Sequence, residues 1–493
     1  MASMTLGPEG IAGGIAGGIS ERSPGADLGA DLGAGLGWAS GRTSGAFTGV
    51  APGPLPDWAA PWAPEAARAV GGPVAWLAGQ YPRATDTFIM REVAGLRALG
   101  LDLRTFSMRR MGPEHLVGPE QRAEAAGTTH VLEAARRPKA ALRAHLAALR
   151  DPLCYVQSLR AAWRTAAPGV KGRALNLVYW HEAVVLAASL RALGAVHLHC
   201  HIAKAACTVA RLAAPLAGVT WSFTLHGPDD LEEPGRWCLR DKLAQADFVS
   251  CISSFCRSQA MLHSDPRDWR KLHVVHCGVE PGRYARASAE APRPGSLLFV
   301  GRLAAAKGVP VLLDALRLAL RRDPSLSLTL VGDGPERAGL ERLAEGLPAT
   351  FLGYRNQAEV AALLATHSTL VLPSFAEGVP VVLMEAQAAG RPVVATRIAG
   401  IAELVEDGRS GRLVPPGEER ALAEALLAVA GSDEAARGQM GEAGRARVVA
   451  EFDSAREAGR LLLLLRHARA GGPRPARRPG ERPGEEPGED GTP

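Results

Sequence analysis

The chain has 493 residues, of which 47% are hydrophobic and 22% charged, so it is long enough and apolar enough for two globular domains. The net charge is only +5 and aromatic residues make up 5%, which argues against a nucleic-acid-binding protein. The seven cysteines include no C-x-x-C pair, as expected in a reducing compartment. No uninterrupted apolar run of about 18 residues and no export signal are present, so we expect a cytoplasmic protein without a membrane-spanning helix.

Both ends of the chain are poor in large apolar side chains. Residues 1–72 alternate Gly with Ala, Leu and Ile, and residues 471–493 mix Arg and acidic residues among prolines. Such segments lose much backbone entropy on ordering and have little apolar surface to bury. We therefore expect a disordered leader, 1–72, and a disordered tail, 471–493.

Between these ends, short apolar runs alternate with longer amphipathic segments such as Val309–Arg321 and Glu336–Glu345, the pattern of parallel strands joined by crossover helices. The expected strands are Val74–Leu77, Val196–Leu198, Trp221–Thr224, Phe248–Cys251, Val274–Val275, Leu297–Val300, Leu328–Val331, Thr350–Leu352, Leu370–Leu372 and Val393–Ala395. The series pauses at the Pro- and Gly-bounded segment Pro281–Gly295. We therefore expect an α/β fold with two doubly wound domains, 73–283 and 284–451, that bind ligands at the carboxyl ends of their strands.

Residues 131–173 carry nine Lys or Arg against two acidic residues, interleaved with apolar side chains such as Leu142, Leu146 and Trp163. A basic amphipathic surface of this kind can lie on anionic lipid. The ordinary solvated face of a helix would give the same pattern. The segment therefore indicates either a peripheral membrane contact or an ordinary solvated surface.

Histidines follow two of the expected strands of the first domain. His197, His199 and His201 share one face of a strand, but no further ligand is placed by the sequence, and hydrogen-bonded core histidines are common, so we expect no metal. His226 ends the next strand and precedes Gly227, which predicts a side chain at the ligand-binding edge. We single out His226 as a site residue.

Two cations follow the strand Leu297–Val300. Arg302 and Lys307 flank a loop that opens a helix, and Arg and Lys suit the binding of a diphosphate. Solvent-facing loop cations are the alternative for either residue alone. Further on, the segment with Gly332 and Gly334 lacks the third small residue of a dinucleotide fingerprint, which disfavours a nicotinamide-dependent oxidoreductase.

The most specific segment is Pro373–Glu385, a strand end followed by a small loop and a helix start. Gly378, Val379 and Pro380 place free backbone N–H groups at a helix N-terminus, which favours an anion. Glu377 can accept hydrogen bonds from sugar hydroxyls, and Glu385, two turns along, from a second polyol such as a ribose.

These residues closely resemble the family 4 retaining nucleotide-sugar glycosyltransferases of GT-B fold, in particular the exopolysaccharide branch that includes the colanic-acid-type enzymes. The resemblance runs from about Val74 to Arg466 and rests on Tyr81–Ile89, His199-Cys-His201, Thr224–Gly227, Lys271–Val279, Gly301–Leu303, Lys307-Gly308 and the E-x7-E pair Glu377 and Glu385. Asp86 and Ala402 depart from the family pattern, which leaves the acceptor open.

The resemblance implies a hexosyltransferase-type enzyme that moves a sugar from a nucleoside-diphosphate sugar to a saccharide or lipid-linked acceptor, with retention and without a metal or other cofactor. It assigns the diphosphate to Arg302 and Lys307, the ribose to Glu385, and the sugar or reacting centre to Glu377 and His226. It also implies a C-terminal helix, 452–470, that crosses back onto the first domain.

On the acceptor side, Thr87 and His201 are the candidates. Cell-surface polysaccharide or glycolipid synthesis on the inner face of the plasma membrane is the expected setting. A catalytically inactive scaffold of the same fold remains the alternative, although Arg302, Lys307, Glu377 and Glu385 are all present.

Overall fold

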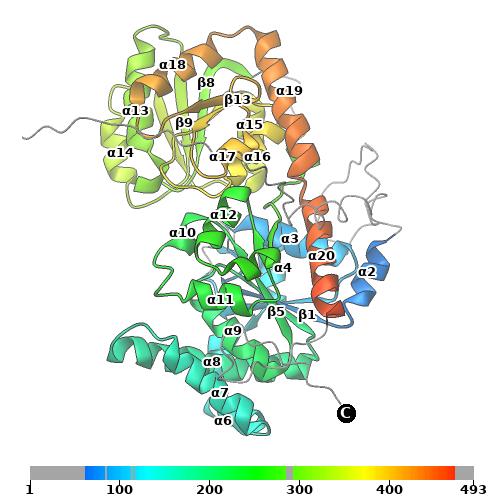
Figure 1. Cartoon of the computed structure of the whole chain (residues 1–493). Coiled ribbons are helices and arrows are strands. Elements are labelled where there is room, and N and C mark those ends of the chain that lie inside the picture. The colour runs from blue at the N-terminus through cyan, green and yellow to red at the C-terminus, as the bar shows by residue number, and fades with distance from the viewer. Residues whose placement is uncertain (1–61, 84–85, 113–114, 117, 285–291, 472–493) are drawn as a thin grey trace, which may run out of the picture. The chain divides into compact units, whose positions relative to one another are not determined.

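The computed structural model describes residues 62–83, 86–112, 115–116, 118–284 and 292–471. All of them belong to one compact unit, Ser40–Pro493. Within it the chain forms two parallel sheets whose strands are joined by helices (Figure 1). The expected α/β class is confirmed.

The first sheet has seven parallel strands in the order β3-β2-β1-β4-β5-β6-β7. Its strands are β1 (Val74–Gln80), β2 (Leu103–Arg109), β3 (Thr129–His130), β4 (His197–His201), β5 (Thr220–Leu225), β6 (Phe248–Cys251) and β7 (Leu272–Val274). The strands β4, β5 and β6 are buried along their whole length; β5 and β6 consist of apolar and small polar residues, whereas β4 carries three buried histidines.

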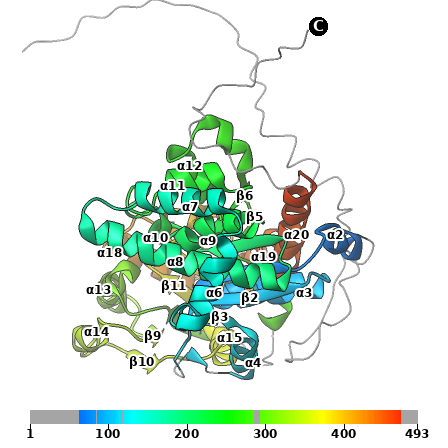
Figure 2. The ribbon, with the colours of Figure 1, turned by 90° about the horizontal axis from the view of Figure 1, so that it is seen from below.

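The helices of this part are α2 (Ala63–Ala69), α3 (Thr87–Ala98), α4 (Pro119–Gly127), α5 (Val131–Ala135), α6 (Pro138–Ala148), α7 (Pro152–Arg164), α8 (Val170–Leu193), α9 (Ala205–Ala217), α10 (Pro228–Leu231), α11 (Leu239–Gln245) and α12 (Ser254–Leu262). Two 3₁₀ helices follow, η2 (Pro266–Lys271) and η3 (Pro281–Tyr284). The helices α6 and α7 lie against the long helix α8 (Figure 2). Most of the basic segment 131–173 therefore lies on α5, α6, α7 and the start of α8.

The second sheet has six parallel strands in the order β10-β9-β8-β11-β12-β13. They are β8 (Arg293–Val300), β9 (Ser327–Val331), β10 (Ala349–Gly353), β11 (His367–Leu372), β12 (Val393–Thr396) and β13 (Gly411–Val414). The helices are η4 (Ala305–Lys307), α13 (Val309–Leu320), α14 (Arg337–Leu343), α15 (Gln357–Thr366), α16 (Val381–Ala388), α17 (Ile401–Leu404), α18 (Glu419–Ala430), α19 (Glu434–Glu451) and α20 (Ser454–Ala470). The strands β8 and β11 are neighbours, so the loops that follow them meet at one edge.

The last helix does not belong to the core of the second sheet. Leu461, Leu462 and Leu465 of α20 are fully buried in a cluster with Trp76 of β1 and Ile89 of α3. In Figure 1 the red helix α20 lies beside α2 and α3. The helix α20 therefore packs on the first domain.

Each strand expected from the sequence overlaps an observed strand, but three strands were missed. The strand β2 carries exposed arginines and buried Thr105 and Ser107 instead of a long apolar run, β3 has two residues, and β13 begins at Gly411. Short or polar strands leave no periodic signal, and their neighbours in the sheet determine them.

The expected leader 1–72 is wrong in its last part. Residues 1–61 lie outside the described residues, but Ala63–Ala69 form α2, with Ala63 and Ala66 fully buried against α20. Alanine side chains are small enough for the two helices to approach closely, so little apolar volume suffices there. The expected tail lies outside the described residues except for Gly471.

Candidate functional site

The loops after β8 and β11 bring Lys307 and Glu377 together. Lys307 Nζ lies 2.6 Å from Glu377 Oε1, and Ser374 Oγ donates a hydrogen bond of 2.6 Å to the same oxygen. Gly308 has φ +63°, and a Cβ there would lie 2.2 Å from the Pro373 carbonyl oxygen. A side chain at Gly308 would thus separate the two loops, so the glycine is required for the contact between the lysine and the glutamate.

The second predicted cation, Arg302, is exposed and has no ion-pair partner among the described residues. It follows Gly301, which comes directly after β8. The Gly301 N–H donates a hydrogen bond to the Val331 carbonyl oxygen. Because the Arg302 guanidinium is exposed and makes no ion pair with a described residue, it can bind a ligand. Gly378, Val379 and Pro380 lead into α16, and Pro380 is the N-cap of that helix.

Glu385 lies in the middle of α16 and is buried. Its Oε1 accepts two hydrogen bonds, 2.7 Å from Arg91 Nη2 and 2.8 Å from the Tyr284 hydroxyl. Burial and the Glu385 charge raise the pKa of Tyr284, so this hydroxyl remains a donor. Both contacts use Oε1, and Oε2 has no hydrogen-bond partner among the described residues, so it can accept hydrogen bonds from a ligand.

Arg91 is a site residue that the sequence did not reveal. It belongs to α3, 294 positions away from Glu385, and is 6% exposed. Its Nε and Nη1 have no hydrogen-bond partner among the described residues. Arg91 and Thr87 line a cavity of about 270 Å³ between α3, α4 and residues 280–283.

The His226 loop touches the Glu377 loop through glycines. A Cβ on Gly227, which has φ +128°, would lie 2.8 Å from Gly378 Cα, and a Cβ on Gly378 would lie 2.4 Å from the His226 carbonyl oxygen. Asp230 holds the His226 loop, because its carboxylate accepts hydrogen bonds from the backbone N–H groups of His226 and Ala203. The structure thus brings together His226 and Glu377, which the sequence placed at the site separately.

The three histidines of β4, His197, His199 and His201, are fully buried. His197 and His199 alternate with the hydroxyls of Thr220, Ser222 and Thr224 at 2.7–2.9 Å. Burial, aided by Arg469, lowers the pKa of His197 to about 3, so the ring is neutral. His201 instead contacts His226, with its Nδ1 2.8 Å from His226 Nε2.

One cluster in the described part of the chain has the composition of a metal site, formed by Glu92, His199 and His201. Both ring nitrogens of His199 already face hydroxyl groups, and His201 Nδ1 faces His226. Too few lone pairs remain for the three or four ligands of a protein metal site. The geometry therefore favours a hydrogen-bonded cluster.

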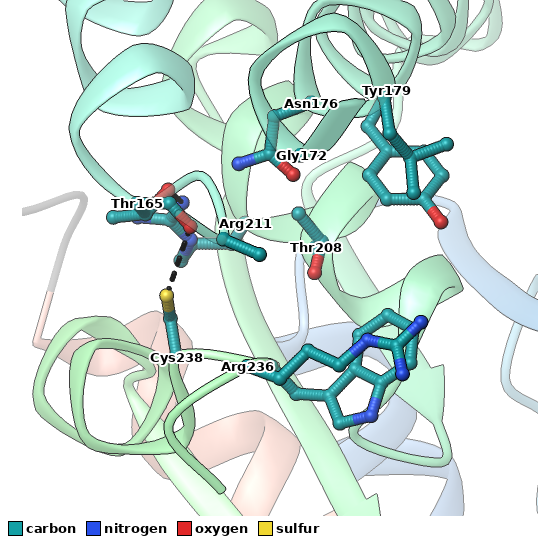
Figure 3. Close-up of a pocket in the computed structure, with 11 residues that line it drawn as sticks. Thr165, Gly172, Asn176, Tyr179, Thr208, Arg211, Arg236 and Cys238 are labelled. Carbon is teal, nitrogen blue, oxygen red and sulfur yellow. Dashed lines mark hydrogen bonds between the residues drawn. The ribbon is translucent and has the colours of Figure 1, made fainter. Parts of the chain in front are cut away.

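A separate small pocket lies beside α8 and is lined by Thr165, Asn176, Arg211 and Cys238 (Figure 3). Its volume of about 30 Å³ has room for a water molecule. Cys238 Sγ donates to the Thr165 carbonyl oxygen at 3.0 Å across it. None of the residues predicted for the site lines this pocket.

The arrangement has the parts needed to bind and cleave a sugar diphosphate. Arg302, Lys307 and the N-terminus of α16 can hold two phosphates, and the buried carboxylate of Glu385 on the same helix can accept hydrogen bonds from a polyol. Glu377 and His226 lie on two loops that touch each other.

Residues 294–432 match the family model described as glycosyl transferases group 1. Residues 294–432 form a group 1 glycosyltransferase domain. They include the second sheet from β8 to β13, and with it Arg302, Lys307, Glu377 and Glu385.

Curated relatives agree with this domain. The glycogen synthase of Mycobacterium tuberculosis is 36% identical over 189 residues, which are 37% of this chain and 45% of the relative. The putative colanic acid biosynthesis glycosyltransferase WcaL of Escherichia coli is 34% identical over 195 residues (37% and 48%), and the amylovoran biosynthesis glycosyltransferase AmsK of Erwinia amylovora is 32% identical over 221 residues (43% and 54%). The matches span about half the length of these relatives.

Solved structures confirm the GT-B architecture of two Rossmann-like domains. Anabaena Alr3699/HepE, solved in complex with UDP and glucose, has a TM-score of 0.60 and 18% identity, covering 79% of this chain and 98% of its own. The sucrose-phosphate synthase of Thermosynechococcus elongatus has a TM-score of 0.59 and 20% identity, covering 81% and 100%. At these identities the likeness establishes the fold.

Proposed function

We propose that the protein is a glycosyltransferase that moves a sugar from a nucleoside-diphosphate sugar to a saccharide or lipid-linked acceptor. The observation that carries the proposal is the pair Lys307–Glu377, held on adjacent loops at the carboxyl ends of β8 and β11 and touched by the His226 loop. Residues 284–451 would bind the donor and residues 73–283 the acceptor, in cell-surface polysaccharide or glycolipid synthesis. UDP and glucose in the similar HepE structure support a donor of this class.

In the proposed complex, Arg302 and Lys307 bind the diphosphate. Arg302 is exposed and unpaired among the described residues, while Lys307 would exchange part of its contact with Glu377 for a phosphate oxygen. The backbone of Gly378–Pro380 and the first turn of α16 add N–H donors. These groups stabilise the charge that develops on the departing diphosphate, so the transfer needs no divalent metal and no other cofactor.

Glu385 would bind the ribose through the oxygen that Arg91 and Tyr284 leave free. Glu377 would bind sugar hydroxyls, and His226 would lie on the opposite side of the sugar. We propose that the acceptor binds on the side of the first sheet, near Thr87, while His201, the other acceptor-side candidate, is fully buried and lies behind His226. We assign no protein nucleophile, and propose retention of the anomeric configuration by attack from the face that the diphosphate leaves.

The test separates binding from chemistry in four variants. Lys307→Ala and Glu385→Ala should weaken the affinity for the free nucleoside diphosphate, because those side chains contact groups present before the reaction. Glu377→Ala and His226→Ala should lower turnover on the order of 100-fold while leaving that affinity nearly unchanged. If the last two variants transfer sugar at the unmodified rate, the reacting centre lies elsewhere.

An inactive scaffold of the same fold would bind the nucleoside diphosphate and give no turnover with any donor. A nicotinamide-dependent oxidoreductase would bind the dinucleotide instead. The Gly332–Gly334 turn disfavours the second alternative, because a Cβ on either glycine would lie within 2.3 Å of a backbone carbonyl oxygen of the β8 loop, which leaves no space for a pyrophosphate there.

We also propose that this enzyme works at the inner surface of the plasma membrane, in the cytoplasm. The described helices include none long and apolar enough to cross a bilayer. Large apolar side chains are nevertheless exposed on α6, α7, α8 and the turn between α6 and α7, namely Leu142, Leu146, Leu149, Leu153, Val156, Trp163, Val170, Leu175 and Val178. The same segment carries the nine Lys and Arg of residues 131–173, which complement anionic lipid.

Vesicle sedimentation tests the membrane contact. Vesicles with anionic lipid should bind the protein at low salt and release much of it at high salt, because salt screens the Lys and Arg charges. Leu146→Ser with Leu153→Ser should lower binding, while Leu343→Ser, an exposed leucine on α14, should not. Equal binding to neutral vesicles, or no effect of the paired serine variant, would contradict the proposal.

A further inference from the structure

Three side chains of the first domain, Glu92, His201 and His226, form a row of direct contacts. Glu92 lies on α3, His201 is the last residue of β4, and His226 follows β5. Glu92 Oε1 is 2.9 Å from His201 Nε2, and His201 Nδ1 is 2.8 Å from His226 Nε2. The two imidazole rings are stacked, with centroids 5.1 Å apart.

We propose that Glu92 and His201 are positioning residues that hold His226 in a single tautomer, with the proton on Nε2 and the lone pair on Nδ1. The proposal deepens the proposed function, since it assumes that His226 contacts the donor sugar. Neither residue need touch the substrate. They would determine which nitrogen of His226 can accept a proton or a hydrogen bond.

The Glu92 carboxylate determines which ring nitrogen of His201 carries the proton. An ionised oxygen and a bare nitrogen lone pair repel each other at 2.9 Å, so the proton of His201 belongs on Nε2, beside Glu92. The contact between Glu92 Oε1 and His201 Nε2 is a close ion-pair contact and not an in-line hydrogen bond, and neither atom has a hydrogen-bond partner among the described residues, so the carboxylate acts on this proton through its charge.

With its proton on Nε2, His201 presents the lone pair of Nδ1 to His226, in a fully buried position beside the rings of Trp76, His199 and His226. The bare Nδ1 accepts the proton that His226 carries on Nε2. Two nitrogens 2.8 Å apart need one proton between them, and this assignment supplies it.

Cys277 completes the row at the other nitrogen. Its Sγ lies 3.7 Å from His226 Nδ1, and burial raises the pKa of the thiol, so the sulfur keeps its proton and faces a nitrogen that can accept it. A thiol is a weak donor, which a sugar hydroxyl can replace. His226 is also fixed by Phe88, whose ring centroid is 4.8 Å away, and by the Asp230 contact to its backbone.

Glu92→Gln is the decisive change because it keeps the size of the side chain and can switch both histidines to the other tautomer. The new amide can donate to His201 Nε2, which moves the His201 proton to Nδ1 and the His226 proton to Nδ1. Nitrogen NMR of histidine-labelled protein, with the His226 signals identified by loss in His226→Gln, reports the two tautomers directly. We expect the Nε2–H form in the unmodified protein and the Nδ1–H form in Glu92→Gln.

Turnover should fall on the order of 100-fold in Glu92→Gln, as for the loss of one well-placed polar contact, with the affinity for the nucleoside diphosphate unchanged. Glu182→Gln is the matched control: it removes another buried carboxyl of the first domain, on α8, and should leave the His226 signals and the turnover as they are.

Three results would overturn the proposal: identical His226 signals in Glu92→Gln and the unmodified protein, a mixture of tautomers in the unmodified protein, or one equivalent of tightly bound zinc that Glu92→Gln loses. The NMR result does not depend on catalysis. If His226→Ala keeps full turnover, the proposed function of His226 fails while the tautomer assignment can still stand.

Discussion

The buried pair Arg91–Glu385 predicts strong energetic coupling between α3 and α16. The perturbations are Arg91→Met, Glu385→Leu and the double variant, which replace the charged groups by apolar groups of similar size. The side chains are 5% and 10% exposed and their charged atoms are 2.7 Å apart, so neither charge is replaced by water when its partner is lost.

Glu385→Leu should lower the free energy of unfolding by about 3–5 kcal/mol, because it leaves a buried guanidinium without its carboxylate. Arg91→Met should cost less, since the Tyr284 hydroxyl still donates to Glu385 and a carboxyl, unlike a guanidinium, can take up a proton. The double variant should be less destabilised than the sum of the two, by about 2 kcal/mol or more.

Urea unfolding of the four proteins gives this double-mutant cycle. The exposed pair Arg322–Glu424, with atoms 2.5 Å apart but side chains 61% and 67% exposed, is the control and should show a coupling below about 1 kcal/mol. Additive effects at Arg91 and Glu385 would refute the argument that burial makes this ion pair coupled.

Two other predictions follow from the packing. Gly378→Ala should lower turnover on the order of 100-fold, because its Cβ would push the Glu377 and His226 loops apart by about 1 Å, whereas Gly438→Ala, with nothing within 4 Å, should keep full turnover. Equal rates in both would disprove the contact. Burial raises the pKa of Glu457 to about 7, against the opposing effect of Arg460. Between pH 4.5 and about 7 the folded state therefore holds a proton that the unfolded state has released, so the free energy of unfolding falls as the pH rises through this range. Glu457→Gln should gain up to about 3 kcal/mol relative to the unmodified protein across that range, measured by urea unfolding at each pH, and a constant difference would contradict it.

Local sequence was sufficient for most of the fold and for the residues that follow strands. Central parallel strands are buried on both faces, so they appear as apolar runs, and Phe248–Cys251 was predicted with its observed bounds. Arg302, Lys307 and Glu377 follow strands of the second sheet and His226 follows a strand of the first, and the loops of His226 and Glu377 touch each other. The strand β2 was missed because Thr105 and Ser107 interrupt its apolar pattern.

Contacts over long sequence separations could not be predicted in this way. Arg91 reaches Glu385 across 294 positions, and within α3 it is indistinguishable from an ordinary helical arginine. His201 and His226 were both recognised, but their contact depends on the register of β4 with β5, which pairs His201 with Thr224. The contact between Glu92 and His201 depends on how α3 packs beside the end of β4.

The Lys307–Glu377 site is proposed to cleave a nucleoside-diphosphate sugar. The most direct measurement is nucleoside diphosphate release from a panel of UDP-, GDP-, ADP- and dTDP-sugars, in the presence of a chelator, by the unmodified protein and by Glu377→Ala. The account predicts release from at least one donor, slowed on the order of 100-fold in Glu377→Ala. Release at the same rate by both proteins, or from no donor in the panel, would contradict it.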